Sequence, residues 1–110
     1  MGNVYVVQES PGKNFLGAMD YGRLEVLLPA DRQVTFSPGP ALYEFRQRLD
    51  KFSDDDFLLL IGDPVAIALA FAVAAETNVG RVKVLKWDKQ ECRYYPIQVE
   101  MYQSRKSIET

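Results

Sequence analysis

The sequence predicts an α+β protein of α/β-like character, in which two helices pack on one mixed sheet of about five to six strands, in the order βββαβαββ. A short apolar segment at 57–61 (FLLLI) is typical of a strand buried on both faces. An alanine-rich helix follows it, and after Gly80 the hydrophobic period changes to two. This succession predicts a right-handed parallel crossover over 57–87, completed by antiparallel edge strands.

The first third of the chain is expected to supply three strands. β-branched and alternating residues favour strands at 3–8 (NVYVVQ) and 23–29 (RLEVLLP), and a tight turn would join the second to a third strand at 33–36 (QVTF). Between the first two strands, residues 9–22 contain several turn formers. We therefore expect an irregular loop there, with room for one helical turn.

The first helix is predicted within 37–52 (SPGPALYEFRQRLDKF). The segment begins with turn-forming residues and then reaches Pro40, and proline is well suited to the first turn of a helix. Apolar side chains then recur at helical spacing opposite a charged face, which predicts an ordinary amphipathic helix; they are Leu42, Phe45, Leu49 and Phe52.

The second helix is predicted to begin at Pro64, with the side chain of Asp63 as its N-cap, and to end near Asn78–Gly80. The alternative, an anion site at this helix N-terminus, is disfavoured because Asp63 already brings a negative charge there. The helix is apolar all round until Glu76, so we expect it to be sealed from solvent. The sheet would cover one side, and the first helix or a symmetry-related chain the other. Roughly 11 apolar residues rise only about 17 Å, too little to span a bilayer.

Residues 81–102 predict a β-hairpin with a polar turn near 88–91. A turn centred on residues 89 and 90 pairs positions whose numbers sum to 179, which places Val82 and Val84 beside Ile97 and Tyr95 on a core face. Val99 and Met101 would continue that core face. The opposite face of the hairpin mixes basic, acidic, aromatic and apolar side chains.

Composition describes an ordinary globular chain, which we expect to form a single domain over 1–110, folded over 3–102 with a flexible tail at 103–110. The net charge of −2 is too small to predict a bulk nucleic-acid binder. Cys92 is the only cysteine, so no intramolecular disulfide can form, and residues 1–20 do not resemble a signal peptide. These features favour a cytoplasmic protein with no membrane association.

Catalytic signals are sparse, and we predict no enzyme activity. The chain has no histidine, which removes the usual base for a serine or cysteine nucleophile and histidine-containing zinc sites. Cys92 is expected to be a bystander thiol, and the three aspartates at 54–56 a solvated surface turn rather than a cation site. No catalytic, cofactor-binding or metal-binding residue is therefore predicted.

The mixed face of the hairpin is the candidate interaction surface. Residues 81–93 carry five basic and two acidic side chains, a local charge of plus three, interleaved with aromatic residues. Such a ribbon could stack single-stranded bases, but its aromatic side chains could equally cover another element or contact another protein, with the lysines protecting an edge strand. The candidate residues are Arg81, Lys83, Trp87, Tyr94 and Tyr102.

Three segments, VYVVQESPGKN, DDDFLLLIGDP with its alanine-rich helix, and KWDKQECRYYPIQVEMY, resemble a group of small uncharacterised proteins of tailed bacteriophages. The resemblance covers nearly all of 3–102 and implies a protein made in the cytoplasm of an infected bacterium. It implies no catalytic residues. The sequence thus predicts a non-enzymatic phage accessory protein, homodimeric, that contacts a host or phage protein. The alternative is a single-stranded nucleic-acid binding protein that uses the hairpin at 81–102.

Overall fold

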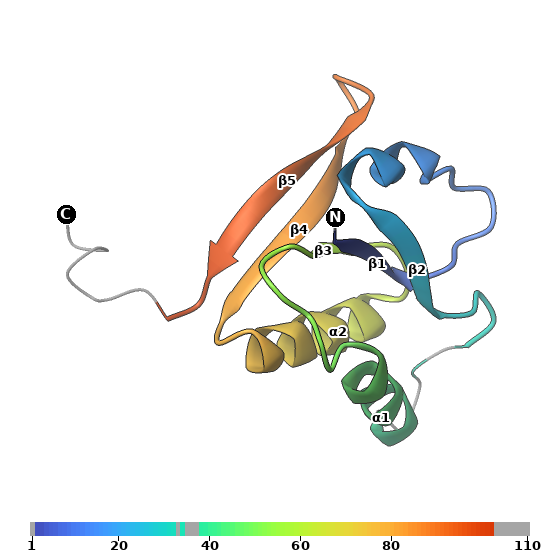
Figure 1. The fold of residues 1–110 in the computed structure, drawn as a ribbon. Helices are drawn as coiled ribbons and strands as arrows, with labels where there is room; N and C mark the ends of the chain where they lie inside the picture. Colours follow the sequence, from blue (N-terminus) through green and yellow to red (C-terminus); the bar gives the residue numbers. More distant parts are fainter. Residues whose placement is uncertain (1, 33, 35–37, 103–110) are drawn as a thin grey trace.

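A computed structural model describes residues 2–32, 34 and 38–102, and Figure 1 shows its five-stranded sheet in the order β2-β1-β3-β4-β5. The first four strands are parallel and β5 is antiparallel to β4, so the predicted α+β fold with one mixed sheet is confirmed. The strands are β1 (Asn3–Gln8), β2 (Arg23–Leu28), β3 (Phe57–Leu59), β4 (Arg81–Asp88) and β5 (Arg93–Glu100).

Two predicted segments cannot be compared in full. The strand expected at 33–36 lies outside the described residues except for Val34, which belongs to no strand. The tail expected at 103–110 also lies outside them. Antiparallel pairing occurs at one edge of the described sheet only, because β2 runs parallel to β1.

The helices divide between the two faces of the sheet. A 3-10 helix, η1 (Leu16–Tyr21), lies in the connection from β1 to β2. It corresponds to the single helical turn that the sequence allows within the loop at 9–22. The helices α1 (Gly39–Arg48) and α2 (Pro64–Thr77) connect β2 to β3 and β3 to β4. Figure 1 shows α1 and α2 on one side of the sheet and η1 on the other. The predicted parallel crossover over 57–87 is therefore confirmed.

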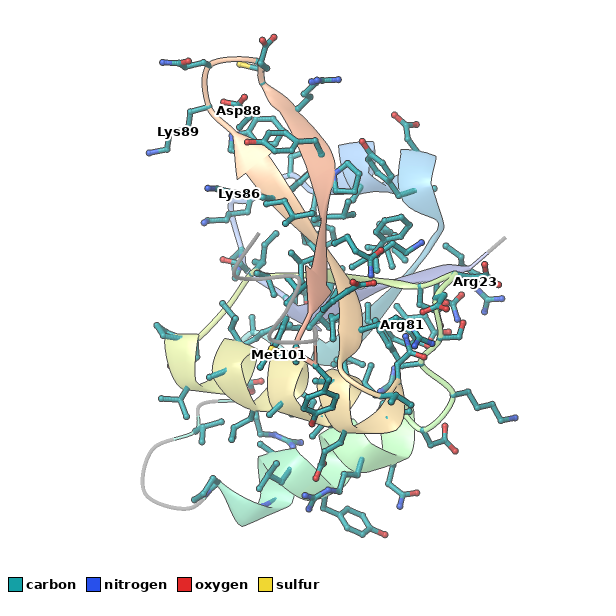
Figure 2. The ribbon with its side chains drawn as sticks, turned by 90° about the vertical axis from the view of Figure 1, so that its left-hand side faces the viewer. Arg23, Arg81, Lys86, Asp88, Lys89 and Met101 are labelled. Atoms are coloured by element: carbon teal, nitrogen blue, oxygen red, sulfur yellow. The ribbon has the colours of Figure 1, made fainter. Side chains whose placement is uncertain are left out.

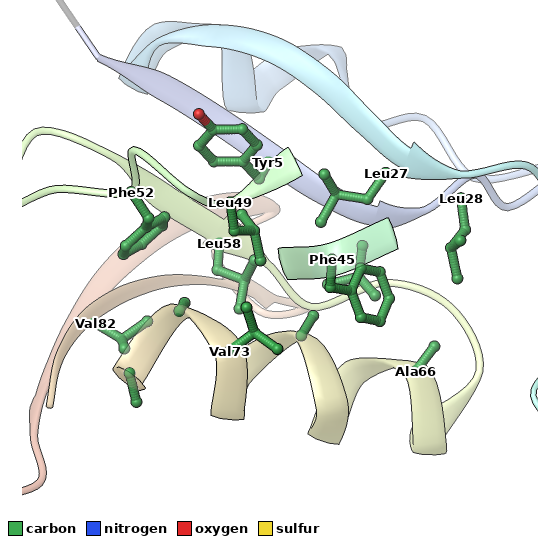
Figure 3. Close-up of a cluster of buried hydrophobic side chains, with 14 of the residues drawn as sticks. Tyr5, Leu27, Leu28, Phe45, Leu49, Phe52, Leu58, Ala66, Val73 and Val82 are labelled. Carbon is green, nitrogen blue, oxygen red and sulfur yellow. The ribbon is translucent and has the colours of Figure 1, made fainter. Parts of the chain in front are cut away.

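Both faces of the central strands are buried, as the FLLLI segment predicts. In β3, Leu58 packs in the core between the sheet and the helices α1 and α2 (Figure 3), while Leu59 belongs to a second core beside η1. Strand β1 divides in the same way, since Tyr5 and Val7 face the helices and Val4 and Val6 face η1. The small side chains of α2 allow it to lie close to the sheet; the buried alanines are Ala66, Ala70, Ala74 and Ala75.

The second helix starts at Pro64 as predicted, but the predicted N-cap is wrong. The side chain of Asp63 makes no capping hydrogen bond; instead its backbone N–H donates to the side chain of Gln8. The expectation that α2 is sealed from solvent is also not met within one chain. The sheet covers one side of the helix and α1 another, but Val65, Ala68 and Ala72 remain exposed between them. Alanine leaves little apolar surface per turn, so this exposure costs less than a stripe of leucines would.

The hairpin faces are predicted correctly, but the register is wrong by two residues. Paired positions sum to 181, as in Val82 opposite Val99 and Val84 opposite Ile97, and the four-residue turn lies at 89–92. A shift of two preserves which side chains share a face. Along β4 the predicted core face is buried, whereas Ile97 and Met101 are exposed because they belong to the edge strand and its end.

The aspartate turn is only partly the surface feature that the sequence predicts. Asp54 and Asp55 are exposed, but Asp56 is 6% exposed and serves as an acceptor inside the fold. Its Oδ1 accepts from the N–H of Asn3 at 2.8 Å, and its Oδ2 accepts from the N–H of Ser53 at 2.9 Å. This carboxylate therefore joins the start of β1 to the turn that precedes β3.

Candidate functional site

The five predicted surface residues do not form one continuous surface. At the start of β4, Arg81 forms an ion pair with Asp54, with 3.1 Å between Nε and Oδ1. The hydrogen bond from Arg81, followed by one from Asn78, holds the pKa of the Asp54 carboxyl below its usual value. Two residues along, the Nζ of Lys83 lies 4.4 Å from the centre of the Phe57 ring. Both cations are thus engaged within the chain.

The two aromatic residues near the hairpin turn have different exposures. Tyr94 is 8% exposed, and this burial raises the pKa of its hydroxyl. Its backbone oxygen accepts a hydrogen bond from the hydroxyl of Tyr21 at 3.0 Å. Trp87 remains 45% exposed and meets the Tyr94 ring edge to face, with 5.0 Å between centroids. Tyr94 therefore helps to fix the position of Trp87, the more exposed of the two rings.

Tyr102 lies apart from these residues. It follows the end of β5, where a side chain on Gly80 would collide with its ring, and it is 75% exposed. Trp87 lies at the other end of the hairpin, because β4 and β5 are antiparallel and Trp87 pairs with Tyr94. Of the five candidates, Trp87 and Tyr94 line an open hollow, and Trp87 is the more exposed of the two.

That hollow, which we call the hairpin pocket, lies where β4 extends beyond the end of β3 and has a volume of about 720 Å³. The chain after β3 forms one wall with Leu60 and Ile61, and the hairpin forms the other. Three of its apolar side chains, Leu60, Trp87 and Ile97, are each more than one-third exposed. The pocket thus presents an apolar surface that is open to solvent.

The rim of the hairpin pocket is positively charged. Among the described residues that line it, the charged ones are Lys13, Lys86 and Lys89, and none is acidic. Figure 2 shows the labelled side chains of Lys86 and Lys89 extending to the same side of the hairpin, at the opposite end of β4 from Arg81. An apolar hollow with a cationic rim suits a ligand that combines apolar groups with negative charge.

Sequence reasoning identified Trp87 and Tyr94 and counted Lys86 and Lys89 in the local positive charge, but it missed the part of the lining that comes from outside the hairpin. Lys13 comes from the loop after β1, and nothing local in the sequence indicates that it lies near the hairpin. One available signal was the difference in strand length. The apolar segment before Gly62 is shorter than the alternating segment after Gly80, so one strand must extend past the other.

A smaller hollow of about 380 Å³ lies beside the N-terminus of α2, between the loops that follow β1 and β3. Ligands of α/β folds often bind at this position, where successive crossovers leave in opposite directions. Among the described residues of its lining, Glu9 and Asp63 carry carboxylates and one residue, Lys13, is a cation. One oxygen of Asp63 is buried with no hydrogen-bond partner among the described residues. This charge balance opposes the anion site that the helix N-terminus alone would favour.

Two further features of the described residues concern metal ligands and membrane-spanning helices. Within 2–32, 34 and 38–102, no group of three or more cysteine, aspartate and glutamate side chains is placed to share a metal ion. No helix in the same part of the chain has the length and apolar character needed to cross a bilayer.

Comparison with known proteins identifies the family. The chain matches the phage Pam3 gp32-like protein family over residues 2–101, and it belongs to this family. The resemblance to small phage proteins is thereby confirmed. No curated protein and no solved structure matches the chain.

Proposed function

We propose that this phage-family protein is a non-enzymatic accessory factor that binds another protein, of the host or of the phage, in the cytoplasm of the infected cell. The observation that carries the proposal is the hairpin pocket, an apolar hollow in which every charged lining residue that the structure describes is a lysine. A half-exposed tryptophan held in place by a buried tyrosine is the kind of rigid anchor on which protein interfaces depend.

The chemistry of the pocket favours binding over catalysis. Among the described lining residues, the polar groups are those of three lysines and Asn14, the hydroxyl of Tyr94 and the indole N–H of Trp87, and no hydrogen bond joins any two of these groups as nucleophile and base. The chain also lacks histidine altogether. Binding needs only the apolar wall, the positive rim and a fixed geometry, and all three are present.

The test is affinity capture from lysate of infected host cells, with mass spectrometry. We would compare the native protein with Trp87→Ala, with the double variant Lys86→Glu and Lys89→Glu, and with Lys51→Glu as a control that reverses one charge on exposed surface outside the pocket. A partner retained by the native protein and the control, and lost by both pocket variants, supports the proposal. Equal capture by all four proteins contradicts it.

Single-stranded nucleic-acid binding is the second candidate, and one observation favours it. Trp87 is half exposed in the segment Lys86–Lys89, and Lys86 and Lys89 line the same pocket, so a base could stack on the indole while phosphates contact the two cations. Against it, Arg81 and Lys83, which would follow the backbone along β4, are already engaged with Asp54 and Phe57. Fluorescence anisotropy with labelled oligothymidine tests it. Binding that weakens steeply with salt and is lost in Trp87→Ala supports this candidate.

A homodimer is a further part of the proposal. Its basis is the exposed apolar stripe of α2 formed by Val65, Ala68 and Ala72. Sedimentation equilibrium at high micromolar concentration would detect such a dimer. We expect Ala72→Glu, at an exposed position, to shift the population toward monomer, and a strict monomer in the native protein contradicts this part.

A further inference from the structure

We propose that the hairpin pocket binds its partner by strand addition: an extended, acidic segment of the partner pairs with the open edge of β4 at Lys86–Asp88. This inference rests on the proposed protein-binding function and specifies its mode. Peptides bound in this way gain affinity from main-chain hydrogen bonds and specificity from pockets that receive alternate side chains.

The open edge follows from the unequal lengths of β3 and β4. Strand β4 pairs with β3 only over Lys83–Leu85, while on its other side it pairs with β5 as far as Asp88. Over Lys86–Asp88, no strand among the described residues occupies the side that faces β3. At a rise of about 3.3 Å per residue, this edge is roughly 10 Å long, enough to form main-chain hydrogen bonds with a short segment.

The chain itself keeps this edge vacant. After β3, the N–H of Ile61 donates to the carbonyl of Leu59 at 3.0 Å, which ends the extended conformation. The carbonyl of Ile61 then accepts from the N–H of Gln8 at 3.0 Å, so the segment bends toward β1 and away from β4. The space in line with β3 therefore becomes the hairpin pocket.

The walls of the pocket come from both faces of the hairpin. Val84 and Ile97 form a cross-strand pair on one face, while Trp87 and Tyr94 form a pair on the other, and all four line the pocket. A ligand confined to one face would touch one of these pairs. An added strand would touch both, because its side chains alternate between the faces. The lining of the pocket is therefore the lining that an additional strand beside β4 would contact.

Charge selects the chemistry of the segment. Three lysines line the hairpin pocket, namely Lys13, Lys86 and Lys89, and none of the described lining residues is acidic. An exposed edge strand that carries lysine is normally protected against unwanted pairing, including pairing with another copy of the same edge. An acidic segment removes that protection, since its carboxylates pair with the lysines as its backbone pairs with β4. We therefore expect apolar residues at alternate positions, flanked by aspartate or glutamate.

The experiment uses short random peptides displayed on a selection library as the probe, with the native protein as bait. Clones that also bind the double variant Lys86→Glu and Lys89→Glu would be discarded, because their binding does not depend on these two lysines. The variant is a suitable counter-selection bait because it alters exposed residues and should fold normally. We expect acidic peptides with alternating apolar residues, whose affinity falls about tenfold in Trp87→Ala. Lys51→Glu is the control that should bind normally.

Two readouts then distinguish strand addition from other modes. N-methylation of alternate peptide residues, those whose N–H groups face β4, should weaken binding about tenfold, and methylation of the intervening residues should change it little. Hydrogen exchange should slow at those backbone amides of Lys86–Asp88 that point away from β5. Peptides that need Trp87 but show neither effect overturn strand addition and leave the protein-binding proposal standing. Enrichment of basic peptides, or of none, overturns the inference, while the proposed function is judged separately by the capture experiment.

Discussion

The side chain of Gln8 accepts a hydrogen bond at Oε1 from the backbone N–H of Asp63, with 2.8 Å between the two atoms. Its Nε2 donates to the carbonyl oxygens of Pro29, at 3.1 Å, and Arg32. Gln8 is 4% exposed, so these bonds are shielded from water. One amide at the end of β1 therefore joins the loops that follow β2 and β3, and the second of these loops forms a wall of the hairpin pocket.

Replacing this amide by an apolar side chain of similar size should destabilise the fold. Gln8→Leu leaves the N–H of Asp63 and two carbonyl groups without their partner, and we expect the free energy of unfolding to fall by about 3 kcal/mol. Urea denaturation followed by circular dichroism measures it. Glu9→Gln, at the exposed neighbouring position, should change the free energy of unfolding by less than about 0.5 kcal/mol. Equal stability of the two variants would show that Gln8 contributes no structural restraint.

The buried aspartate before β3 should behave differently from its neighbour. Asp56→Ala removes the acceptor for the N–H groups of Asn3 and Ser53 and for the Ser53 hydroxyl, and should lower the free energy of unfolding by about 3 kcal/mol. Asp55→Ala changes an exposed side chain and should be neutral within about 0.5 kcal/mol. Thermal unfolding of both variants gives the comparison, and a neutral Asp56→Ala would contradict the assignment.

These two residues show where sequence reasoning succeeds and where it fails. Hydrophobic periodicity predicts the elements, because burial depends on which side chains share a face, and a hairpin register that is wrong by two residues leaves the faces unchanged. The run of three aspartates looks uniformly polar in sequence. Only the path of the chain places Asn3 beside Asp56, across a separation of 53 residues.

The candidate site was harder to predict than the helices and strands, because it too depends on the path of the chain. Its tryptophan stands out in the sequence, but the pocket beside it exists because β3 ends early and because Gln8 draws the following loop toward β1. Lys13 reaches the rim from a separate loop. Conversely, the sequence predicts that Arg81 and Lys83 contact a partner, but in the fold these two cations contact Asp54 and Phe57.

The Arg81–Asp54 ion pair should make stability depend on pH only in acid. Hydrogen bonds from Arg81 and then Asn78 lower the folded-state pKa of Asp54 from its usual 3.8. A carboxyl with a lowered pKa stabilises the fold above its unfolded-state pKa, and this contribution is lost as the pH falls through the folded-state value. The stability difference between the native protein and Asp54→Asn should therefore be constant from neutral pH to about pH 5 and shrink below pH 3.8. Urea titrations across this range measure it, and a difference that grows in acid would contradict the pairing.

Trp87 is the only tryptophan of the chain, so its fluorescence reports directly on the hairpin pocket. The lysines of the rim should concentrate anions around the half-exposed indole and repel cations. We therefore expect iodide to quench the emission about twofold more strongly than caesium at low ionic strength, after both are normalised to a free tryptophan amide. The excess should disappear in high concentrations of a salt that does not quench, because screening acts on the exposed charges.

The same measurement with charge variants tests whether these particular lysines create the field. The double variant Lys86→Glu and Lys89→Glu should reverse the preference, so that caesium quenches more strongly than iodide. Lys51→Glu changes the charge of an exposed residue outside the pocket and should leave the ratio unchanged. If the ratio is near one in the native protein, or if Lys51→Glu lowers it as much as the double variant does, the positive rim is not a property of the pocket. A ratio above one that only the pocket lysines control would show that the pocket has the positive potential by which an acidic segment would be attracted to the open edge of β4.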